Sequence, residues 1–373
     1  MEEWVAFPRY NIPPMSKGRV MVAMSGGVDS SVAALMLTRA GYECIGMTAI
    51  LFGDASAAGP CCGTEGANSA ECVCNKLGIE FRHIDLSELF EEQVIGRFLG
   101  EYDAGRTPNP CSDCNRFIKF DTFFRYADEW GCDYVATGHY ARIIEDGSAR
   151  LLGTGIDNNK DQSYFLACIP PERLKRVLFP LGGIDKPEVR RLAREALLPT
   201  AHRTESQDVC FMHNGAGIDE LMSWHMGKAP EPGEVVDEAG NVLSTHKGYQ
   251  RYTVGQRRGM RLGGGTEGLV VHRVEPETNR VVVAMKDAHP LDYVSMRDFV
   301  DMAPGRWQLG QDIQVRMRYR QPLFRARVLE HEGQLRVYPL ERQYGAALGQ
   351  WCVGYSGDVV LFGGIIDGVE YET

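Results

Sequence analysis

The chain has 373 residues, of which 44% are hydrophobic and 24% are charged. This composition excludes disordered and fibrous proteins, and the length allows two or three domains with cores of their own. The net charge of −10 argues against a wholly basic nucleic-acid binder but permits a local basic face. No apolar run is long enough for a membrane span, and Met1–Met15 lacks the pattern of a signal or transit peptide. We therefore expect a cytoplasmic protein.

Short apolar runs alternate with helical patterns from Arg19 to about Met212. The helical patterns cover Asn115–Trp130 and Lys186–Leu197, the second with Asp185 as its expected cap. The apolar runs, typical of buried parallel strands, are Val20–Ala23, Cys44–Ile50, Phe81–Asp85 and Tyr134–Thr137. The alternation predicts an α/β domain over residues 18–215, with a doubly wound, mostly parallel sheet, after a tail of residues 1–17.

The pattern changes from about Gly233, where short β-like runs are separated by Gly, Pro and Asn turns with almost no helical periodicity. These runs are Gly268–Val274, Arg280–Ala284, Ile313–Tyr319, Ala326–Leu329, Gln334–Tyr338 and Asp358–Phe362. They predict two small all-β domains, over residues 216–286 and 287–373, the last a β-barrel.

A Gly/Ser loop, Ser25-Gly26-Gly27-Val28-Asp29-Ser30-Ser31, follows the first expected strand and opens a helix. Glycines let the backbone approach an anion, and hydroxyls with free helix amides form a cradle for phosphate. Asp29 would repel phosphate unless it holds a cation or orients the loop, and Mg²⁺ bridging Asp29 and a pyrophosphate is the simplest interpretation. The loop resembles the SGGxDS loop of the N-type ATP pyrophosphatases, which cleave ATP to AMP and pyrophosphate.

Eleven cysteines are present, and without a secretion signal they are poor evidence for disulfides. Cys111 and Cys114 form a C-x-x-C pair, and Cys114 comes directly before the expected helix Asn115–Trp130, whose free amides would favour a thiolate. No second C-x-x-C lies at zinc-ribbon spacing, which argues against zinc. Cys210 follows a short β-like run and, taken alone, is equally well a core residue.

Further motifs, in chain order, indicate a more specific family resemblance. They are GRTPNPCSDCNRFIKF (105–120), ATGHYAR (136–142), NKDQSYFL (159–166), LFPLGGIDKPEVRRLA (178–193), ESQDVCF (205–211), YTVGQRRG (252–259) and RYRQ (318–321). Together with SGGVDSS they resemble the tRNA-specific 2-thiouridylase family (tRNA-uridine 2-sulfurtransferase, MnmA) from about Arg19 to the C-terminus.

The resemblance implies ATP-dependent 2-thiolation of the wobble uridine of tRNAs for Lys, Glu and Gln, with sulfur from a cysteine desulfurase or relay protein. Cys210 corresponds to the persulfide carrier and Cys114 to the thiol that closes a disulfide with it, while Cys111 stands where some relatives carry Asp. The positions that correspond to ATP contacts are Ala23, Met24, Ser25, Gly26, Gly27, Val28, Asp29, Ser30, Ala49 and Gly138. Those that correspond to tRNA contacts are Asn109, Pro110, Cys111, His139, Lys160, Asp161, Gln162, Arg318, Tyr319 and Gln350.

An acidic protein that binds tRNA needs concentrated basic surface. Arg316, Arg318 and Arg320 alternate with apolar residues, which on a strand would place three guanidiniums on one face, and Arg325 with Arg327 repeats the pattern. A second basic group in a Gly-rich loop contains Arg257, Arg258 and Arg261.

Two alternatives remain open at this point. One is another adenylating synthetase with the same loop, which would need neither the paired cysteines nor the arginine pattern. The other is a non-catalytic iron–sulfur or tRNA-binding protein. Cys111, Cys114 and Cys210 could then supply three thiolates to a [4Fe-4S] cluster, a mode that a thiolating enzyme could also use. The sequence assigns no role to the four cysteines Cys61, Cys62, Cys72 and Cys74.

Overall fold

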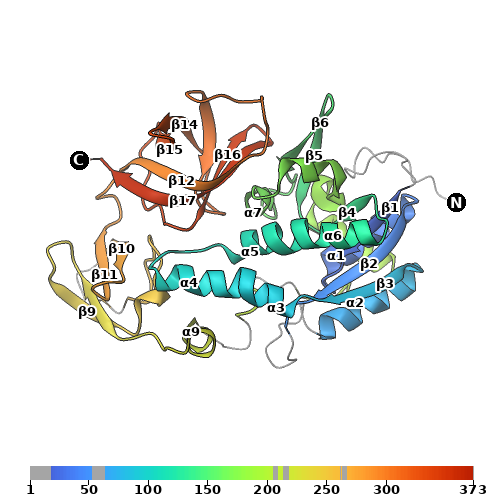
Figure 1. The fold of residues 1–373 in the computed structure, drawn as a ribbon, viewed down its shortest axis with the longest axis horizontal. Coiled ribbons are helices and arrows are strands. Elements are labelled where there is room, and N and C mark those ends of the chain that lie inside the picture. Colours follow the sequence, from blue (N-terminus) through green and yellow to red (C-terminus); the bar gives the residue numbers. More distant parts are fainter. Residues whose placement is uncertain are drawn as a thin grey trace.

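The computed structural model describes residues 18–52, 64–204, 209–212, 218–260, 262 and 267–372. Its first part is a parallel five-stranded sheet in the order β3-β2-β1-β4-β7 (Figure 1). The strands are β1 (Arg19–Ala23), β2 (Glu43–Ile50), β3 (Glu80–Asp85), β4 (Tyr134–Ala136) and β7 (Val177–Leu178). The four strands expected from the apolar runs are all present in this sheet, so the α/β class is confirmed.

Helices cover both faces of the parallel sheet because its strands are apolar on both sides. Val20 and Val22 of β1 belong to one buried cluster, which includes residues of α1 (Val28–Arg39), α2 (Thr64–Leu77) and α8 (Lys186–Glu195). Met21, between them, faces the opposite cluster. The helical segments on that opposite side are α3 (Ser87–Phe90), η2 (Glu91–Gly96), α4 (Arg97–Asp103), α5 (Pro110–Asp113), η3 (Cys114–Thr122) and α6 (Phe123–Glu129).

A second sheet of four strands has the order β10-β11-β8-β9, in which β8 and β11 are parallel. Its strands are β8 (Gly233–Val236), β9 (Val242–His246), β10 (Leu269–Glu275) and β11 (Arg280–Met285). A small core of Val235, Val271, Val281 and Val283 lies against it. The helix α9 (Ile218–Met226) precedes this sheet, within the stretch that the sequence pattern assigned to an all-β unit.

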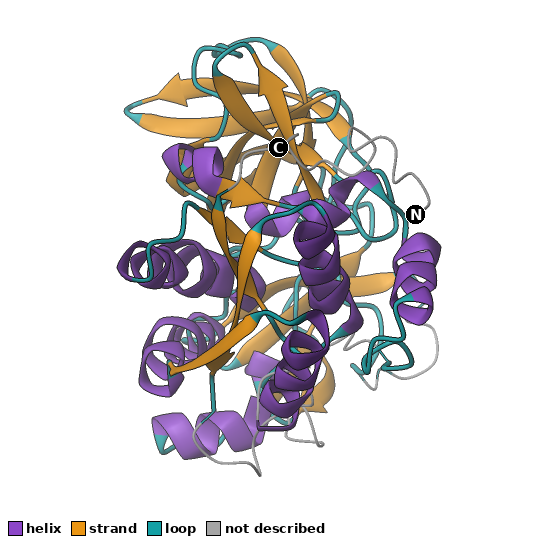
Figure 2. Cartoon of the chain, turned by 90° about the vertical axis from the view of Figure 1, so that its right-hand side faces the viewer, coloured by secondary structure: helices purple, strands orange, loops and turns teal. Residues whose placement is uncertain are grey.

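The last part is a β-barrel, as expected. Neighbouring strands follow the order β12-β15-β14-β13-β16-β17, and β12 also pairs with β17, which closes six strands into a barrel. Figure 2 shows these strands gathered at the top of the molecule, away from most of the helices. The strands are β12 (Leu291–Asp301), β13 (Asp312–Arg316), β14 (Phe324–His331), β15 (Gln334–Pro339), β16 (Trp351–Ser356) and β17 (Val359–Tyr371).

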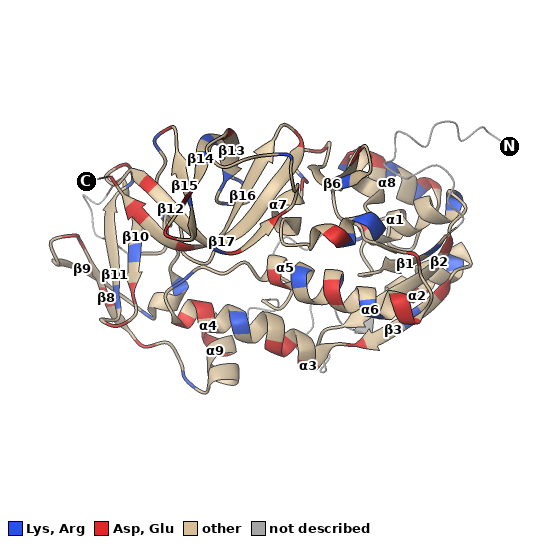
Figure 3. Ribbon diagram, turned by 45° about the horizontal axis from the view of Figure 1, so that its top comes forward, with Lys and Arg blue, Asp and Glu red and all other residues tan. Residues whose placement is uncertain are grey.

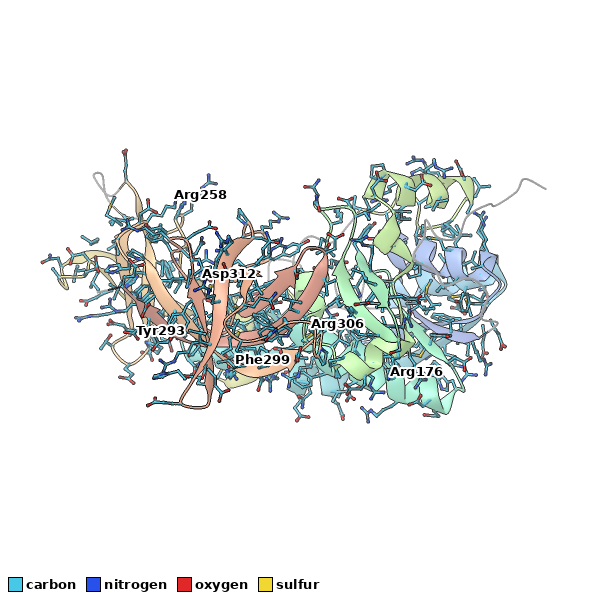
Figure 4. The ribbon with its side chains drawn as sticks, turned by 90° about the horizontal axis from the view of Figure 1, so that it is seen from above. Arg176, Arg258, Tyr293, Phe299, Arg306 and Asp312 are labelled. Carbon is cyan, nitrogen blue, oxygen red and sulfur yellow. The ribbon has the colours of Figure 1, made fainter. Side chains whose placement is uncertain are left out.

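A hairpin from the α/β domain extends the barrel sheet, and the sequence pattern did not reveal it. Strands β5 (Ala141–Asp146) and β6 (Ala149–Thr154) pair with each other, and Gly153 of β6 pairs with Val359 of β17. Arg142 contacts Asp358 at 2.6 Å, and Arg306 contacts Asp146 at 2.6 Å. Arg306 lies where the barrel meets the α/β domain (Figure 4). The two domains are therefore joined through backbone pairing as well as side chains.

Four shorter elements complete the described chain: α7 (Ser163–Leu166), η4 (Pro171–Arg176), η5 (Pro180–Gly183) and η6 (Tyr249–Arg251). Within the described ranges, none of the helices combines the length and the apolar character that crossing a membrane requires.

Candidate active site

The Gly/Ser loop lies between β1 and α1, at the edge of the sheet where the parallel strands end. Gly26 has φ of +71°, and a Cβ there would lie 2.4 Å from the carbonyl oxygen of Gly66. Gly138, after β4, approaches the loop from the side, where a Cβ would lie 2.7 Å from the Ser30 amide nitrogen. Both positions therefore require glycine, because neighbouring backbone packs directly against the loop and the start of α1 there.

Hydroxyl groups brace this loop from within. The Ser30 hydroxyl accepts a hydrogen bond from the Ser25 amide at 3.2 Å and lies 3.3 Å from the Ser25 hydroxyl. Thr48 of β2 donates to the Met24 carbonyl, which places neighbouring Ala49 at the same sheet edge. The expected ATP contacts thus lie on or beside one loop, with Ala49 and Gly138 on the two adjoining strand ends.

Asp29 has two partners that the sequence analysis did not assign. Lys186, the first residue of α8, places its Nζ 2.7 and 2.9 Å from the two Asp29 carboxylate oxygens. Tyr140 donates its hydroxyl to the same carboxylate at 2.7 Å. The carboxylate is therefore neutralised and held by protein groups. This arrangement does not fit direct ligation of Mg²⁺ by Asp29, and it favours the interpretation that Asp29 orients the loop.

The C-x-x-C pair lies on a helix that begins earlier than the sequence pattern predicted. Asn109 caps the helix by accepting a hydrogen bond from the Ser112 amide, and the helical segments α5, η3 and α6 continue from Pro110 to Glu129. Cys111 is exposed in the first turn, while Cys114 lies in the second turn with 8% of its surface exposed. Burial raises the pKa of Cys114 to about 12.

The expectation of a stabilised thiolate at Cys114 is therefore wrong for this state of the protein. The free helix amides belong to the first turn, and desolvation of the buried sulfur outweighs the nearby Lys119, which lowers the pKa. The charges of Cys210 and Cys111 contribute to raising it, so the three thiols lie within electrostatic reach of one another. Cys210 is half-buried and packs against the core cluster that contains Cys114.

Lys119 connects the thiol group to the Gly/Ser loop. Its Nζ lies 3.4 Å from Nε2 of His139, whose Nδ1 lies 2.7 Å from the Thr137 hydroxyl. Burial, together with the charge of Lys119, lowers the pKa of His139 well below its usual range, so the imidazole is neutral. Because His139 directly follows Gly138, the cysteines and the candidate nucleotide loop adjoin a common ammonium–imidazole pair. Lys119 lies within a quoted motif, but nothing in the pattern identified its contact with His139.

Asp113, between the two cysteines, is also buried. Burial raises the pKa of Asp113 to about 6, although Arg97 and Arg116 oppose the shift. The side chain lines a cavity of about 20 Å³, between the helices and the barrel, with Arg97, Glu101 and Arg297. Nothing in the sequence pattern points to a role for Asp113.

Several residues that correspond to tRNA contacts use their polar atoms within the chain. Asp161 is buried and accepts hydrogen bonds from the amides of Gly155 and Ser163. The Gln162 side chain accepts from the Tyr140 amide, while Gln350 donates to the carbonyl of Thr107 at 2.9 Å. They therefore shape the site from within, whatever else they contact.

The remaining tRNA positions lie around the same region. Tyr319 packs against Phe165 with ring centroids 4.4 Å apart. Asn109 and Lys160 are half-buried, and Pro110 is buried at the start of α5.

The expected arginine stripe is only partly present. Strand β13 ends at Arg316, so Arg318 does not continue the alternation and instead donates to the carbonyls of Val254 and Gly345. Arg325 and Arg327 both pair with Asp312, at 2.7 and 2.5 Å. Figure 3 shows basic and acidic residues interspersed over the barrel. Arg320, Arg257 and Arg258 are exposed.

Some residues singled out from the sequence lie outside the described part of the chain: Cys61, Cys62, Arg261 and Glu205–Asp208. Cys72 and Cys74 both lie on α2, the first exposed and the second buried.

Comparison with family models divides the chain into three matched parts. A model described as tRNA methyl transferase HUP domain matches residues 18–214. Models described as tRNA methyl transferase PRC-barrel domain and aminomethyltransferase beta-barrel domain match residues 221–285 and 294–366.

Curated relatives match almost the whole chain. The tRNA-specific 2-thiouridylase MnmA of Thermus thermophilus is 42% identical over 359 residues, covering 93% of this chain and 94% of that protein. The enzyme of the same name from Acidithiobacillus ferrooxidans is 39% identical over 361 residues, covering 95% of this chain and 100% of that protein. With this identity over nearly the full length, the chain belongs to the tRNA-specific 2-thiouridylase family of sulfurtransferases.

Proposed function

We propose that this chain uses ATP to replace the C2 oxygen of the wobble uridine, in tRNAs for Lys, Glu and Gln, by sulfur carried on Cys210. The observation that carries the proposal is the adjacency of two sites. The Lys119–His139 pair connects the thiol group of Cys111, Cys114 and Cys210 with the loop at Gly26–Ser30. Activation and sulfur transfer must act on the same carbon atom, so this chemistry needs both sites side by side.

ATP fits the Gly/Ser loop. The loop leads into the first turn of α1, where helix amides favour a phosphate, and Lys186 cancels the carboxylate that would repel it. In the first step the uridine O2 attacks the α-phosphorus, pyrophosphate leaves, and O2 becomes part of an AMP leaving group. The uridine must leave the anticodon stack to reach this position.

The sulfur transfer that follows needs two thiols, one to carry the sulfur and one to release it. The outer sulfur of a Cys210 persulfide attacks C2, and Cys114 attacks the inner sulfur of that persulfide. The Cys210–Cys114 disulfide forms, the C2–S bond remains, and AMP leaves with the oxygen. A thiol reductant and a protein persulfide donor, either a cysteine desulfurase or a relay protein, restore the starting state. Because Cys114 is protonated at rest, its activation requires a local rearrangement or a base near the bound tRNA.

A second mode is favoured by the third thiol. Cys111 is exposed and lies within electrostatic reach of Cys114 and Cys210, so three thiolates could hold a [4Fe-4S] cluster. Such a cluster would supply an open iron that binds sulfide. In that mode no disulfide forms between Cys114 and Cys210.

The decisive experiment is thiolation of unmodified tRNAs with ATP, Mg²⁺ and a persulfide source, followed by mass spectrometry of nucleosides. We expect 2-thiouridine with the parent enzyme and none with Cys210→Ser or Cys114→Ser. The control is Cys72→Ser, an exposed thiol on α2, which should retain activity. ATP cleavage without 2-thiouridine would point to another adenylating synthetase. Activity found only in brown, anaerobically purified protein would support the cluster mode instead.

A further inference from the structure

Two histidines and a glutamate meet outside the proposed active site. Glu238 lies in the turn after β8, His272 lies on β10, and His289 lies in the linker from the central sheet to the barrel. One nitrogen or oxygen atom from each lies within 4.8 Å of the other two. In the described part of the chain, this is where three potential metal ligands of the His, Cys, Asp and Glu types come this close together.

The contacts among these residues are specific. His289 Nε2 lies 2.5 Å from the Glu238 carboxylate, and the two imidazole rings are stacked with centroids 4.3 Å apart and planes 29° apart. The Tyr371 ring closes one side, 4.9 Å from the His272 ring. The histidines are half-buried, and Glu238 is exposed, so an ion could enter from the side of the carboxylate.

We propose that Glu238, His272 and His289 form a binding site for a divalent transition-metal ion such as Zn²⁺. Imidazole nitrogens with one carboxylate suit such ions, whereas Mg²⁺ and Ca²⁺ prefer all-oxygen ligands. Three protein ligands leave a fourth position for water. Arg273 is the cation beside His272, and its guanidinium is paired with Glu275 at 2.8 Å, which limits its repulsion of the ion.

The location indicates what the ion would do. Glu238 and His272 belong to the central sheet, while His289 stands immediately before β12 of the barrel. A shared ion would connect the two β domains at their linker and would hold their relative orientation. Arg318, which donates to the Val254 carbonyl, is a protein contact across the same pair of domains. The ion would thus act as a structural clamp and would take no part in sulfur transfer.

The test must separate this site from the cysteines, because thiolates in general are good ligands for Zn²⁺. We would titrate metal-free Cys111→Ser/Cys114→Ser/Cys210→Ser protein with Zn²⁺ by calorimetry, and with Co²⁺ by absorption. We expect one ion per chain, with a Co²⁺ spectrum that lacks thiolate charge-transfer bands. Adding His272→Ala, His289→Ala or Glu238→Gln should weaken binding at least about tenfold. His331→Ala, an exposed histidine on the barrel, is the matched control and should bind as the parent does.

Folding is checked by thermal melting in EDTA, where Glu238→Gln, a change at an exposed side chain, should match its parent. Zn²⁺ should then raise the melting temperature of the parent and of His331→Ala, but not that of Glu238→Gln. Absence of binding in the parent, equal binding in the Glu238→Gln variant, or a purely thiolate Co²⁺ spectrum would each overturn the proposal.

Discussion

Lys186 and Asp29 form an ion pair across 157 residues of sequence, with Nζ 2.7 Å from Oδ1. The lysine begins the helix α8 and the aspartate lies in the first turn of α1, so the pair ties two helices on one face of the sheet. Its position beside the Gly/Ser loop makes it the counter-charge that lets a phosphate approach an acidic side chain.

Replacing Lys186 by methionine should therefore weaken ATP binding. The Asp29 carboxylate would keep only the Tyr140 hydroxyl and would repel the triphosphate. We expect the KM for ATP to rise at least about tenfold, which corresponds to about 1.4 kcal/mol, as measured by pyrophosphate release. Lys175→Met, at an exposed lysine in η4, is the control. An unchanged KM for ATP in the Lys186 variant would show that the pair is purely structural.

The two cysteines of the C-x-x-C pair should differ in reactivity. Burial raises the pKa of Cys111 to about 11 and that of Cys114 to about 12, so both are neutral thiols at pH 8. Cys111 nevertheless has an exposed surface whereas Cys114 is buried, so access of the reagent decides which thiol reacts. Brief treatment with iodoacetamide should therefore label Cys111 first, as peptide mass spectrometry would show. In denaturant both should react at similar rates. Faster labelling of Cys114 in the native protein would mean that the resting site is open.

Ionisation of the Asp113 carboxyl should make the free energy of unfolding depend on pH. Its pKa is raised from 3.8 to about 6 by burial, so the stabilising protonated form prevails at low pH and is lost as the pH rises through 6. The difference corresponds to about 3 kcal/mol at most. Asp113→Asn, which stays neutral, should be more stable than the parent at pH 8, and this advantage should vanish near pH 4. Urea unfolding at the two pH values measures it, and equal stability at pH 8 would contradict the prediction.

Gln350 should act mainly by positioning the loop before the C-x-x-C helix. Its side chain donates to the carbonyls of Thr107 and Pro108 and accepts from the Tyr164 hydroxyl. Gln350→Ala should lower the free energy of unfolding by about 1–3 kcal/mol, because it removes partners of buried groups.

The same variant should reduce the rate of thiolation more than the affinity for tRNA, measured by filter binding. Gln314→Ala, at an exposed position on β13, is the control and should change neither quantity. A large loss of tRNA affinity with unchanged stability would instead support the direct contact that the family resemblance implies.

The sequence predicted those features that depend on local pattern. The buried strands around Met21 and Ile45 and the Asp185 cap, which accepts from the Glu188 amide, are present. Features that depend on distant partners were missed or wrong. The sequence around Lys186 does not reveal its contact with Asp29. The position of Cys114 near a helix start likewise does not reveal that its sulfur is buried.

The arginine alternation failed for a related reason. Side chains alternate between the two faces of a sheet only within a strand, and β13 ends at Arg316. The alternation therefore does not apply to Arg318 and Arg320. The hairpin of β5 and β6 was overlooked because its strands, Ala141–Asp146 and Ala149–Thr154, mix charged and polar residues with apolar ones and form no continuous apolar run.

That hairpin has a consequence for how the protein can be divided. Strand β6 pairs with β17, near the C-terminus, through Gly153 and Val359. A chain cut at the end of the α/β region would keep β6 but lose β17, and one edge of β6 would be left unpaired. A shortened chain ending near residue 215 would expose that strand edge to other copies. The α/β region and the barrel are therefore expected to fold together, as parts of one chain.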